Sequence, residues 1–395
     1  MPKHVVIAGG GPAGMMLGLL LARAGLRATV LEKHRDFLRD FRGDTIHPST
    51  LEVLHELGLA EAFLRLPHQE VRELSAQFGN ERLKFVDFRG VRARYPFIAM
   101  IPQWDFLDFL AREARAYAGS EVRMACEALD LLFSGERVIG VRTSQGDIEA
   151  DLVVAADGRH SRLREKAGLP AIDLGAPIDA LWFRVSRRPD DPPDTMARFD
   201  RGSILVMLNR GDYWQCAFVI AKGGFDALKL RGLDSFRATL ARLMPFAEGR
   251  LGEIGSWDDV KLLTVQVNRL RKWHREGLLC IGDAAHAMSP VGGVGINLAI
   301  QDAVAAANIL WRGDFSLPRL EAVQARRQFP TAVTQRLQVL VQDRVLSRVL
   351  DPRGEPVRPP LPLRLVTRLA YARRIPARLV GVGVRPEHVR SPVAA

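Results

Sequence analysis

The feature that most constrains the fold of this sequence is a glycine-rich turn close to its start. Residues 9–14 read Gly-Gly-Gly-Pro-Ala-Gly, which fits the pattern G-x-G-x-x-G. The run Val5-Val6-Ile7-Ala8 precedes the turn, an apolar helical stretch follows it, and a second β-branched run ends at Glu32. Strand, glycine turn, helix, strand and acid in this order are typical of the βαβ unit that binds a dinucleotide.

The glycines and the acid of this unit have separate mechanical roles. Gly9 makes the tight turn, Gly11 lets the backbone approach a pyrophosphate, and Gly14 lets the helix pack against the strand. The helix N-terminus offers unpaired N–H groups to the phosphates, and Glu32 is suited to accept hydrogen bonds from ribose hydroxyls. The turn alone does not distinguish FAD from NAD. The predicted site also includes the neighbouring residues Ala13 and Lys33.

Two later motifs distinguish the two cofactors. Residues 157–164 match D-G-x-x-S-x-x-R, and residues 282–297 match G-D-A-A-H-x-x-x-P-x-x-G-x-G-x-N. Together with the glycine turn, they make the sequence resemble the single-component FAD-dependent aromatic hydroxylases, the p-hydroxybenzoate hydroxylase-like flavoprotein monooxygenases, over roughly residues 1–310. The resemblance implies FAD as the bound cofactor, NADH or NADPH as a transient reductant and O2 as co-substrate. It also implies hydroxylation of a small aromatic or quinone-like substrate through a flavin C4a-hydroperoxide.

The resemblance assigns residues to parts of the flavin. Asp283 is expected at the ribityl chain, Pro290 over the flavin beside the substrate, and Asp157 near the cofactor without a catalytic role. A helix that starts within the third motif can direct N–H groups toward the C2 carbonyl of the ring. Arg42 and Gln103 occupy positions that reach the cofactor in the family. The residues assigned to the isoalloxazine ring are Gly293, Gly295, Ile296 and Asn297.

The motifs identify catalytic and substrate-binding residues less clearly than they identify cofactor-binding residues. His47 is our candidate for a base or proton relay, because the family's loop after the second strand comes near the flavin; a capping or packing role fits the same position. Pro290 is a second candidate, through its backbone, whereas His286 is expected to be structural. Alternation alone does not tell which side chains of the inserted sheet face the substrate. The candidates there are Trp182, Arg184, Met207, Trp214 and Gln215.

The order of predicted elements indicates an α/β fold. It consists of a Rossmann-like FAD-binding domain, an inserted β-sheet substrate domain with period-two alternation, and a helical C-terminal segment. The FAD-binding domain is expected to be discontinuous, with residues 1–70, 101–175 and 269–310. The substrate domain is assigned residues 71–100 and 176–268, and the C-terminal segment residues 311–395.

Cysteine content and hydropathy exclude other classes of protein. The three cysteines, Cys126, Cys216 and Cys280, lie too far apart for a CxxC redox pair, a disulfide framework or a cysteine-rich zinc site, and no metal site is predicted. The chain enters its first strand almost at once, which leaves no room for a signal peptide. No apolar run is expected to reach the roughly 18 residues of a spanning helix. We therefore expect a cytoplasmic protein.

The net charge of +11 is concentrated toward the C-terminus. Residues 311–395 hold 16 arginines, no lysine and six acidic residues, which gives +10 there and about +1 elsewhere. The cofactor-binding part therefore gives no argument for nucleic-acid binding. Residues 363–374, with basic residues beside leucines at helical spacing, fit two arrangements. They form either a peripheral membrane contact that draws in a lipophilic substrate, or a closing helix packed on the flavin domain or on a homodimer partner.

Three rival functions fit the same fold. The main alternative is an FAD-dependent reductase or dehydrogenase that acts on a prenyl or other lipophilic substrate without inserting oxygen. A flavin-dependent halogenase is disfavoured, because no two tryptophans are separated by a single residue. A flavin-binding sensor would show no turnover. Oxygen uptake with NADH or NADPH, with and without a phenolic or quinone-like compound, distinguishes these functions.

Overall fold

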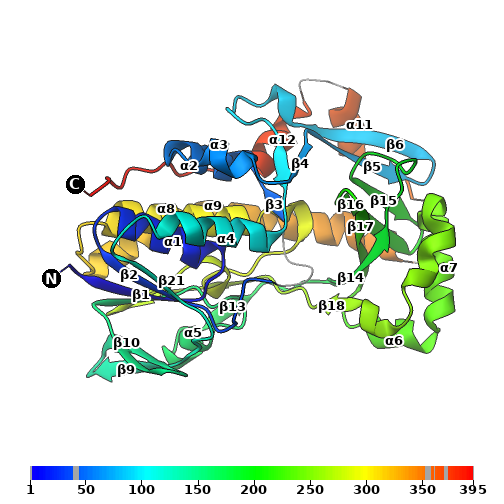
Figure 1. The fold of residues 1–395 in the computed structure, drawn as a ribbon. Coiled ribbons are helices and arrows are strands. Elements are labelled where there is room, and N and C mark those ends of the chain that lie inside the picture. The colour runs from blue at the N-terminus through cyan, green and yellow to red at the C-terminus, as the bar shows by residue number, and fades with distance from the viewer. Residues whose placement is uncertain (1, 39–43, 352–356, 360, 369–371, 395) are drawn as a thin grey trace.

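Two β-sheets lie along the molecule, and long helices from the C-terminal part run beside both (Figure 1). The computed structural model describes residues 2–38, 44–351, 357–359, 361–368 and 372–394. Both ends of the chain lie at the end of the molecule that holds the first sheet (Figure 1). The mixed α/β architecture confirms the predicted fold class.

The first sheet carries the glycine turn. Its strand order is β20-β21-β12-β1-β2-β8, with parallel pairing except at the β20 edge. The residues of β1 from Val5 to Ala8 are all buried, as is usual for a parallel strand covered on both faces. The strands are β1 (His4–Ala8), β2 (Arg27–Leu31), β8 (Ser120–Arg123), β12 (Leu152–Ala155), β20 (His274–Arg275) and β21 (Leu278–Cys280).

Helices cover one face of this sheet and a small sheet covers the other. The helices that pack together on the first face are α1 (Pro12–Arg23), α4 (Gln103–Ala114) and α8 (Gly295–Leu310). The cover on the second face consists of α5 (Arg162–Lys166) and the antiparallel strands β9 (Ala128–Ser134), β10 (Arg137–Thr143) and β11 (Gly146–Glu149).

Helix α8 corrects one expectation from the sequence. Together with the turn before it, the segment Val291–Leu310 has the length and hydropathy of a membrane-spanning helix, although we expected no such run. In the fold, 78% of its most apolar window is buried. The helix packs against α1 and α9, so its apolar character is that of a core helix.

The second sheet has the strand order β18-β14-β17-β16-β15-β5-β6. Two distant parts of the chain meet in it, because β5 pairs in parallel with β15. Helices α6 (Phe225–Leu230) and α7 (Leu233–Leu243) cover one of its faces. The strands are β5 (Glu73–Phe78), β6 (Glu81–Asp87), β14 (Ile178–Ser186), β15 (Met196–Asp200), β16 (Ser203–Asn209), β17 (Tyr213–Ala221) and β18 (Lys261–Leu263).

Smaller elements connect the two sheets. The three-stranded sheet β3-β7-β4 lies between them, with α2 and α3 beside it (Figure 1). A two-stranded sheet joins β13 to β19. The bounds are β3 (Thr45–Ile46), β4 (Gln69–Val71), β7 (Ile98–Met100), β13 (Ala171–Asp173), β19 (Asn268–Leu270), α2 (Pro48–Glu56) and α3 (Ala60–Leu64).

The C-terminal segment wraps around the rest of the chain. Helix α9 (Leu317–Val341) packs on α8 and continues through one π-helical turn, Gln342–Leu346, into α10 (Ser347–Leu350). Helices α11 (Leu361–Arg368) and α12 (Arg374–Gly381) lie on β6. Near the end of the chain, the Ala394 N–H donates to the Arg23 carbonyl at 2.8 Å.

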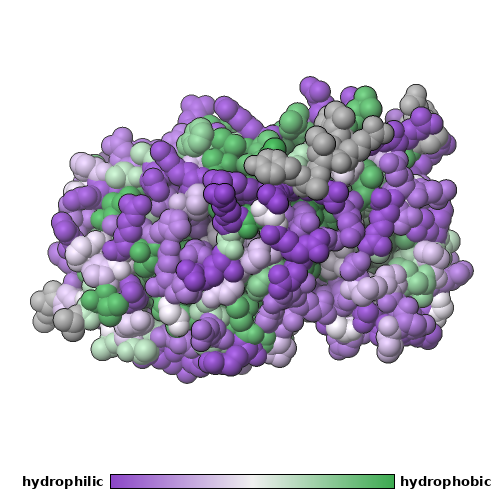
Figure 2. Space-filling model, turned by 90° about the horizontal axis from the view of Figure 1, so that it is seen from above, coloured by the Kyte–Doolittle hydropathy of each residue, from purple (hydrophilic) through white to green (hydrophobic). Residues whose placement is uncertain are grey.

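The basic segment therefore packs on the second sheet of its own chain, whereas the expected closing helix was to pack on the flavin domain or on a dimer partner. The Arg364 guanidinium donates to Glu81 on β6 at 2.9 Å, while residues 369–371 of the segment lie outside the described residues. Seen from above, where α12 and β6 lie, hydrophilic side chains cover most of the surface and hydrophobic ones emerge in small groups (Figure 2).

Candidate active site

One cavity of about 1860 Å³ extends from the glycine turn to the second sheet. Arg42 lies outside the described residues, Gly14 lies behind the turn, and Asn297 is absent from the cavity wall. The other predicted cofactor residues all line this cavity: Gly9, Gly11, Ala13, Glu32, Lys33, Gln103, Asp157, Asp283, Pro290, Gly293, Gly295 and Ile296.

The turn between β1 and α1 requires glycine at two positions. Gly9 has φ 112°, and a Cβ there would lie 2.2 Å from the Ala156 carbonyl oxygen. A Cβ on Gly14 would lie 2.0 Å from the Gly9 oxygen. Gly11 differs, because a Cβ there would meet no atom within 4 Å on the cavity side. No side chain caps the N-terminus of α1, so its N–H groups are available to a phosphate.

Glu32, directly after β2, is held by backbone groups. Its Oε2 accepts a hydrogen bond from the Gly10 N–H at 3.2 Å, and its Oε1 accepts one from the His34 N–H at 3.0 Å. The carboxylate is therefore oriented at the cavity wall, where it can accept hydrogen bonds from a ribose.

Asp157 is half-buried in the wall after β12. Its Oδ2 accepts from the Leu163 N–H at 3.2 Å, whereas its Oδ1 has no hydrogen-bond partner among the described residues. Burial raises the pKa of this carboxyl, and hydrogen bonds from the following loop oppose the shift. Arg164 secures that loop by donating to the carbonyls of Ala284 and Arg159, at 3.1 and 3.0 Å. Asp157 thus presents one buried, unsatisfied oxygen beside the cavity.

The third motif forms a glycine loop before α8. Gly292 and Gly293 have φ 81° and 64°. The Thr45 hydroxyl donates to the Gly293 carbonyl at 2.9 Å, and a Cβ on Gly293 would lie 2.6 Å from the Thr45 oxygen. The loop is therefore fixed against β3, with Pro290 and Ile296 on the cavity wall.

Asn297 stabilises this loop from outside the cavity. Its Oδ1 accepts from the His47 N–H at 3.0 Å and from the Thr50 hydroxyl at 2.7 Å. The side chain therefore joins α8 to the start of α2. The assignment of Asn297 to the isoalloxazine ring stays a prediction, because its side chain is engaged behind the loop.

His47 also lies outside the cavity lining, which corrects its assignment as a candidate base. The side chain is fully buried, its Nδ1 lies 2.8 Å from the Val380 carbonyl, and its Nε2 has no partner among the described residues. Burial lowers its pKa to about 4, so the imidazole is neutral at physiological pH. His47 precedes α2 as its N-cap and turns toward α12, so it occupies a packing position.

Asp302 on α8 anchors the turn that carries Asp283. Its Oδ2 accepts from the Gly282 N–H at 3.0 Å and lies 2.5 Å from His286 Nε2, and its Oδ1 accepts from Arg327 at 3.0 Å. All of these side chains are buried. The geometry gives His286 a structural position behind the motif.

Buried glutamines on α9 and the π-helical turn hold the segment before the glycine loop from behind. Gln338 donates to the carbonyls of Ser289 and Val291, both at 2.9 Å. Gln342 donates to the Ser289 hydroxyl at 2.5 Å, and Gln335 donates to a carbonyl just before the loop at 3.1 Å. We call Gln335, Gln338 and Gln342 the glutamine row. Our sequence analysis missed it, although its spacing of three and four residues is a signal for one helix face.

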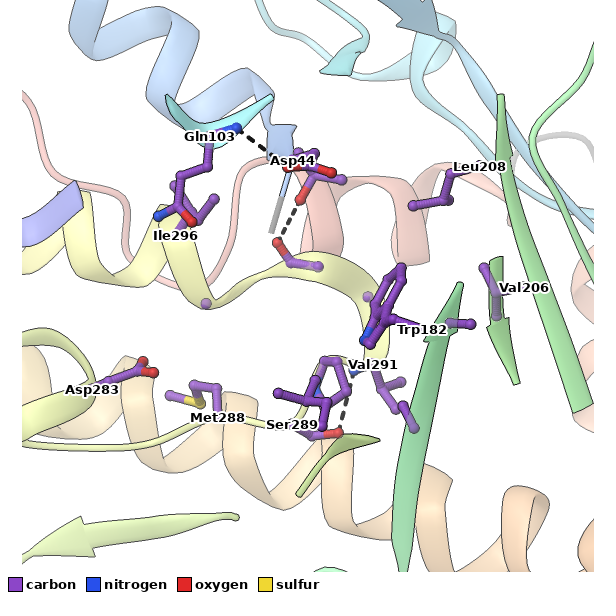
Figure 3. A pocket seen from close by; sticks show the side chains of 18 of the residues that line it. Asp44, Gln103, Trp182, Val206, Leu208, Asp283, Met288, Ser289, Val291 and Ile296 are labelled. Atoms are coloured by element: carbon purple, nitrogen blue, oxygen red, sulfur yellow. Dashed lines mark hydrogen bonds between the residues drawn. The ribbon is translucent and has the colours of Figure 1, made fainter. Parts of the chain in front are cut away.

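The second sheet supplies an apolar wall of the cavity, beyond the glycine loop. Trp182, Val206 and Leu208 project into the cavity (Figure 3). Met207 and Trp214, predicted as substrate residues, lie on the other face in the core against α7. Trp214 is also tied there, because its Nε1 donates to Asp191 at 2.9 Å. The alternation of these strands left their faces open, and the structure places Met207 and Trp214 on the face turned away from the cavity.

Two further substrate candidates lie near the wall without lining it. The Arg184 guanidinium stacks over the Tyr213 ring at 5.6 Å. Gln215 is buried and accepts from Arg210 at 3.0 Å. Of the five candidates, Trp182 lines the cavity.

An ion pair that sequence reasoning missed joins the second sheet to the segment before the small sheet β3-β7-β4. Arg210, in the β16–β17 hairpin, donates to Asp44, which lines the cavity directly before β3. Asp44 also accepts from the Gln103 N–H at 3.2 Å, at the start of α4 (Figure 3). Burial raises the Asp44 pKa, and Arg210 opposes this shift. The two residues are 166 positions apart, so no local pattern marks them as partners.

The motif end of the cavity fits FAD. An open face at Gly11, an uncapped helix N-terminus, an unpartnered buried oxygen on Asp157 and a fixed glycine loop are what a bound flavin dinucleotide needs. Bound FAD would supply the electron-transfer and oxygen chemistry. The protein would hold its phosphates, ribityl chain and ring, while the apolar sheet excludes water.

The comparisons with known proteins agree with this geometry. Residues 3–336 match a family model described as an FAD binding domain. The chain is 34% identical over 354 residues to the 6-methylpretetramide 4-monooxygenase of Streptomyces rimosus, which covers 87% of this chain and 84% of that protein. It is 30% identical to the 12-dehydrotetracycline 5-monooxygenase/anhydrotetracycline 6-monooxygenase of Streptomyces rimosus, which covers 79% of this chain. The chain spans 62% of that longer relative.

Solved structures share the fold at lower identity. PqsL of Pseudomonas aeruginosa superposes with a TM-score of 0.76 at 22% identity and covers 89% of this chain and 98% of that one. The OxyS anhydrotetracycline hydroxylase of Streptomyces rimosus has a TM-score of 0.73 at 24% identity and covers 96% of this chain and 76% of that one. The family match confirms FAD as the predicted cofactor. The chain therefore belongs to the FAD-dependent, p-hydroxybenzoate hydroxylase-like monooxygenases and is an oxidoreductase.

Proposed function

We propose that this monooxygenase uses NADH or NADPH and O2 to hydroxylate a polycyclic aromatic substrate. The observation that carries the proposal is a single cavity shared by the flavin-binding motifs and the apolar face of the second sheet. Its volume of about 1860 Å³ exceeds the roughly 300–1,000 Å³ of an ordinary ligand pocket. The space therefore suits a cofactor and a second, sizeable ligand together.

The chemistry of the wall supports an extended, flat and apolar substrate. Trp182 offers an aromatic face, and its neighbours Val206 and Leu208 are aliphatic. Relatives named for oxidation of pretetramide and anhydrotetracycline point to fused-ring substrates for this chain as well. The residues of the wall would orient the substrate ring toward the flavin loop and keep water away from the reacting atoms.

Oxygen uptake and product mass test the proposal together. The FAD-loaded protein is mixed with NADH or NADPH, with and without fused-ring phenols. We expect the phenol to accelerate oxygen consumption and to gain one oxygen atom, which isotope-labelled O2 supplies. If NAD(P)H is oxidised and a lipophilic double bond is reduced while no oxygen enters the product, the reductase alternative replaces this proposal.

A relative of this chain is named for a different reaction, so the product has to be identified and not only the oxygen uptake measured. A dialkyldecalin synthase of Streptomyces rugosporus is 28% identical to this chain.

We also propose a cytoplasmic location, and homodimer contact as the first partner arrangement to test for residues 311–395. Sedimentation of the intact protein, alone and with anionic vesicles, distinguishes a dimer from a membrane contact.

A further inference from the structure

We propose that Arg344 and Arg348 form an anion-binding subsite at the sheet end of the cavity, where they bind an acidic oxygen group of the apolar substrate. The inference rests on the proposed function and specifies its substrate: a hydrophobic fused-ring acid, such as a carboxylate or an acidic enol. We call Arg344 and Arg348 the arginine pair.

The arginine pair lies where α9 passes through its π-helical turn into α10. Arg344 is inside the turn Gln342–Leu346, and Arg348 follows four residues later. Both side chains are exposed and line the cavity. Within the described part of the chain, neither guanidinium forms an ion pair. Single π-helical turns are rare and often occur at functional sites.

The surroundings of the pair are strongly apolar. Leu346 and Val349, which lie beside the arginines in sequence, pack against the cavity face of the second sheet. The charged residues that line the rest of the cavity lie in or beside the FAD-binding motifs, apart from Asp44 and Glu127. Among the residues that the structure describes, the charged lining at the sheet end consists of the arginine pair, Arg358 and Asp351. This end of the cavity therefore combines an apolar wall with an excess of positive charge.

Such a combination selects a particular kind of ligand. Two like charges four residues apart on a helix repel each other, and an anion between them removes that cost. A guanidinium presents a planar fork that matches a carboxylate or a pair of neighbouring oxygens. Because the wall is apolar, a bound ring system excludes water from the contact and strengthens it. A neutral ligand would gain only the apolar part of this binding.

Hydrogen bonds also fix the position of the arginine pair relative to the loop Ser289–Val291. Gln342, in the same π-helical turn as Arg344, donates to the Ser289 hydroxyl. Gln338, one turn earlier, donates to the carbonyls of Ser289 and Val291. The segment that would hold the acidic group is thus bonded directly to the loop that faces the flavin. The position of the acid in the substrate would therefore determine which ring carbon lies nearest the flavin.

A matched pair of ligands tests the subsite without turnover. The FAD-loaded protein is titrated with anthraquinone carboxylate and with its methyl ester, and binding is followed by the change in flavin absorbance. The variants are R344Q, R348Q, the double variant R344Q/R348Q and the charge-preserving R344K/R348K. Arg336, exposed on α9 and outside the cavity lining, supplies the control R336Q.

We expect the natural protein to bind the carboxylate about tenfold more tightly than the ester, as one charge-assisted hydrogen bond would give. R344Q/R348Q should lose this preference and keep the ester affinity, while R336Q should keep the preference and R344K/R348K should retain part of it. Equal affinities in the natural protein, or a preference that survives in R344Q/R348Q, would overturn the subsite.

Two further measurements separate this proposal from others. The KM for NADH and for NADPH in flavin reduction without substrate should be the same in R344Q/R348Q and in the natural protein. A selective rise in either would mean that the arginines bind the phosphates of the reductant, and would overturn the substrate assignment. If the carboxylate preference holds but no oxygen is transferred to any ligand, the subsite stands and the proposed hydroxylation fails.

Discussion

The buried guanidinium of Arg210 is paired with the carboxylate of Asp44, and this pair attaches the hairpin of the second sheet to the cofactor-binding part. The Asp44 carboxylate also holds the first N–H of α4 at Gln103. Removing one partner of a buried ion pair leaves the other charge uncompensated and costs about 3–5 kcal/mol. We expect Arg210→Met to lower the free energy of unfolding by this amount in urea denaturation.

The exposed pair Arg82 and Asp194 provides the comparison. Exposed ion pairs contribute about 0–1 kcal/mol, so Arg82→Met should change stability little. Asp44→Asn combined with Arg210→Met should recover part of the loss, because no buried charge then remains unpaired. Equal losses for Arg82→Met and Arg210→Met would contradict the role given to the buried pair.

The two ends of the glycine turn should respond differently to alanine. Gly9→Ala forces a Cβ into the Ala156 carbonyl at a φ of 112°, so we expect a poorly folded protein. Gly11→Ala meets no atom within 4 Å and adopts an ordinary φ of −74°, so the apoprotein should keep its melting temperature. Its methyl group, however, would occupy the approach of the pyrophosphate. Isothermal titration with FAD should therefore show weaker binding by Gly11→Ala, and unchanged FAD affinity would exclude Gly11 from the phosphate site.

Neighbouring residues on β16 should separate substrate binding from stability. Met207 is 1% exposed in the core against α7, so Met207→Ala should cost about 2–5 kcal/mol in unfolding experiments. Val206 faces the cavity, so Val206→Ala should weaken binding of anthraquinone carboxylate more than it lowers stability. Chemical denaturation and ligand titration of both variants would check this assignment of faces. Reversed effects would mean that the strand presents its other face to the ligand.

His47 should affect the pH dependence of stability and leave that of the reaction unchanged. Its pKa falls from 6.5 in the unfolded chain to about 4 in the fold, so only the unfolded chain is protonated between these values. Stability should therefore be highest above pH 6.5 and should decline as the pH falls toward 4. In His47→Asn, urea unfolding at neutral pH and near pH 5 should show a smaller difference. A His47-dependent limb in the pH profile of kcat near neutrality would restore His47 as a catalytic candidate.

The sequence identified residues whose roles are encoded locally. Gly9 and Asp283 follow from fixed spacings around a strand end, and such spacings determine the backbone around them. The faces of β16 could not be predicted in this way. Met207 packs on α7 and Val206 lines an apolar cavity, so both faces of the strand are hydrophobic and alternation carries no signal.

Contacts between residues far apart in the sequence could not be predicted either. The direction of the His47 ring depends on the Val380 carbonyl, 333 residues away. The Asp44 and Arg210 pair exists only once the hairpin and β3 have been brought together. Contacts of this kind are set by tertiary packing, which one sequence does not reveal.

The glutamine row has a consequence for the order in which the enzyme matures. All three cofactor-binding motifs lie before residue 298. The side chains that support the loop Ser289–Val291 and the residue just before it lie later, at positions 335, 338 and 342. A nascent chain that has been synthesised only as far as its third motif therefore still lacks the glutamine row that supports this loop. We therefore expect tight retention of FAD only once α9 has been synthesised, which would make cofactor loading a late event in the production of this protein.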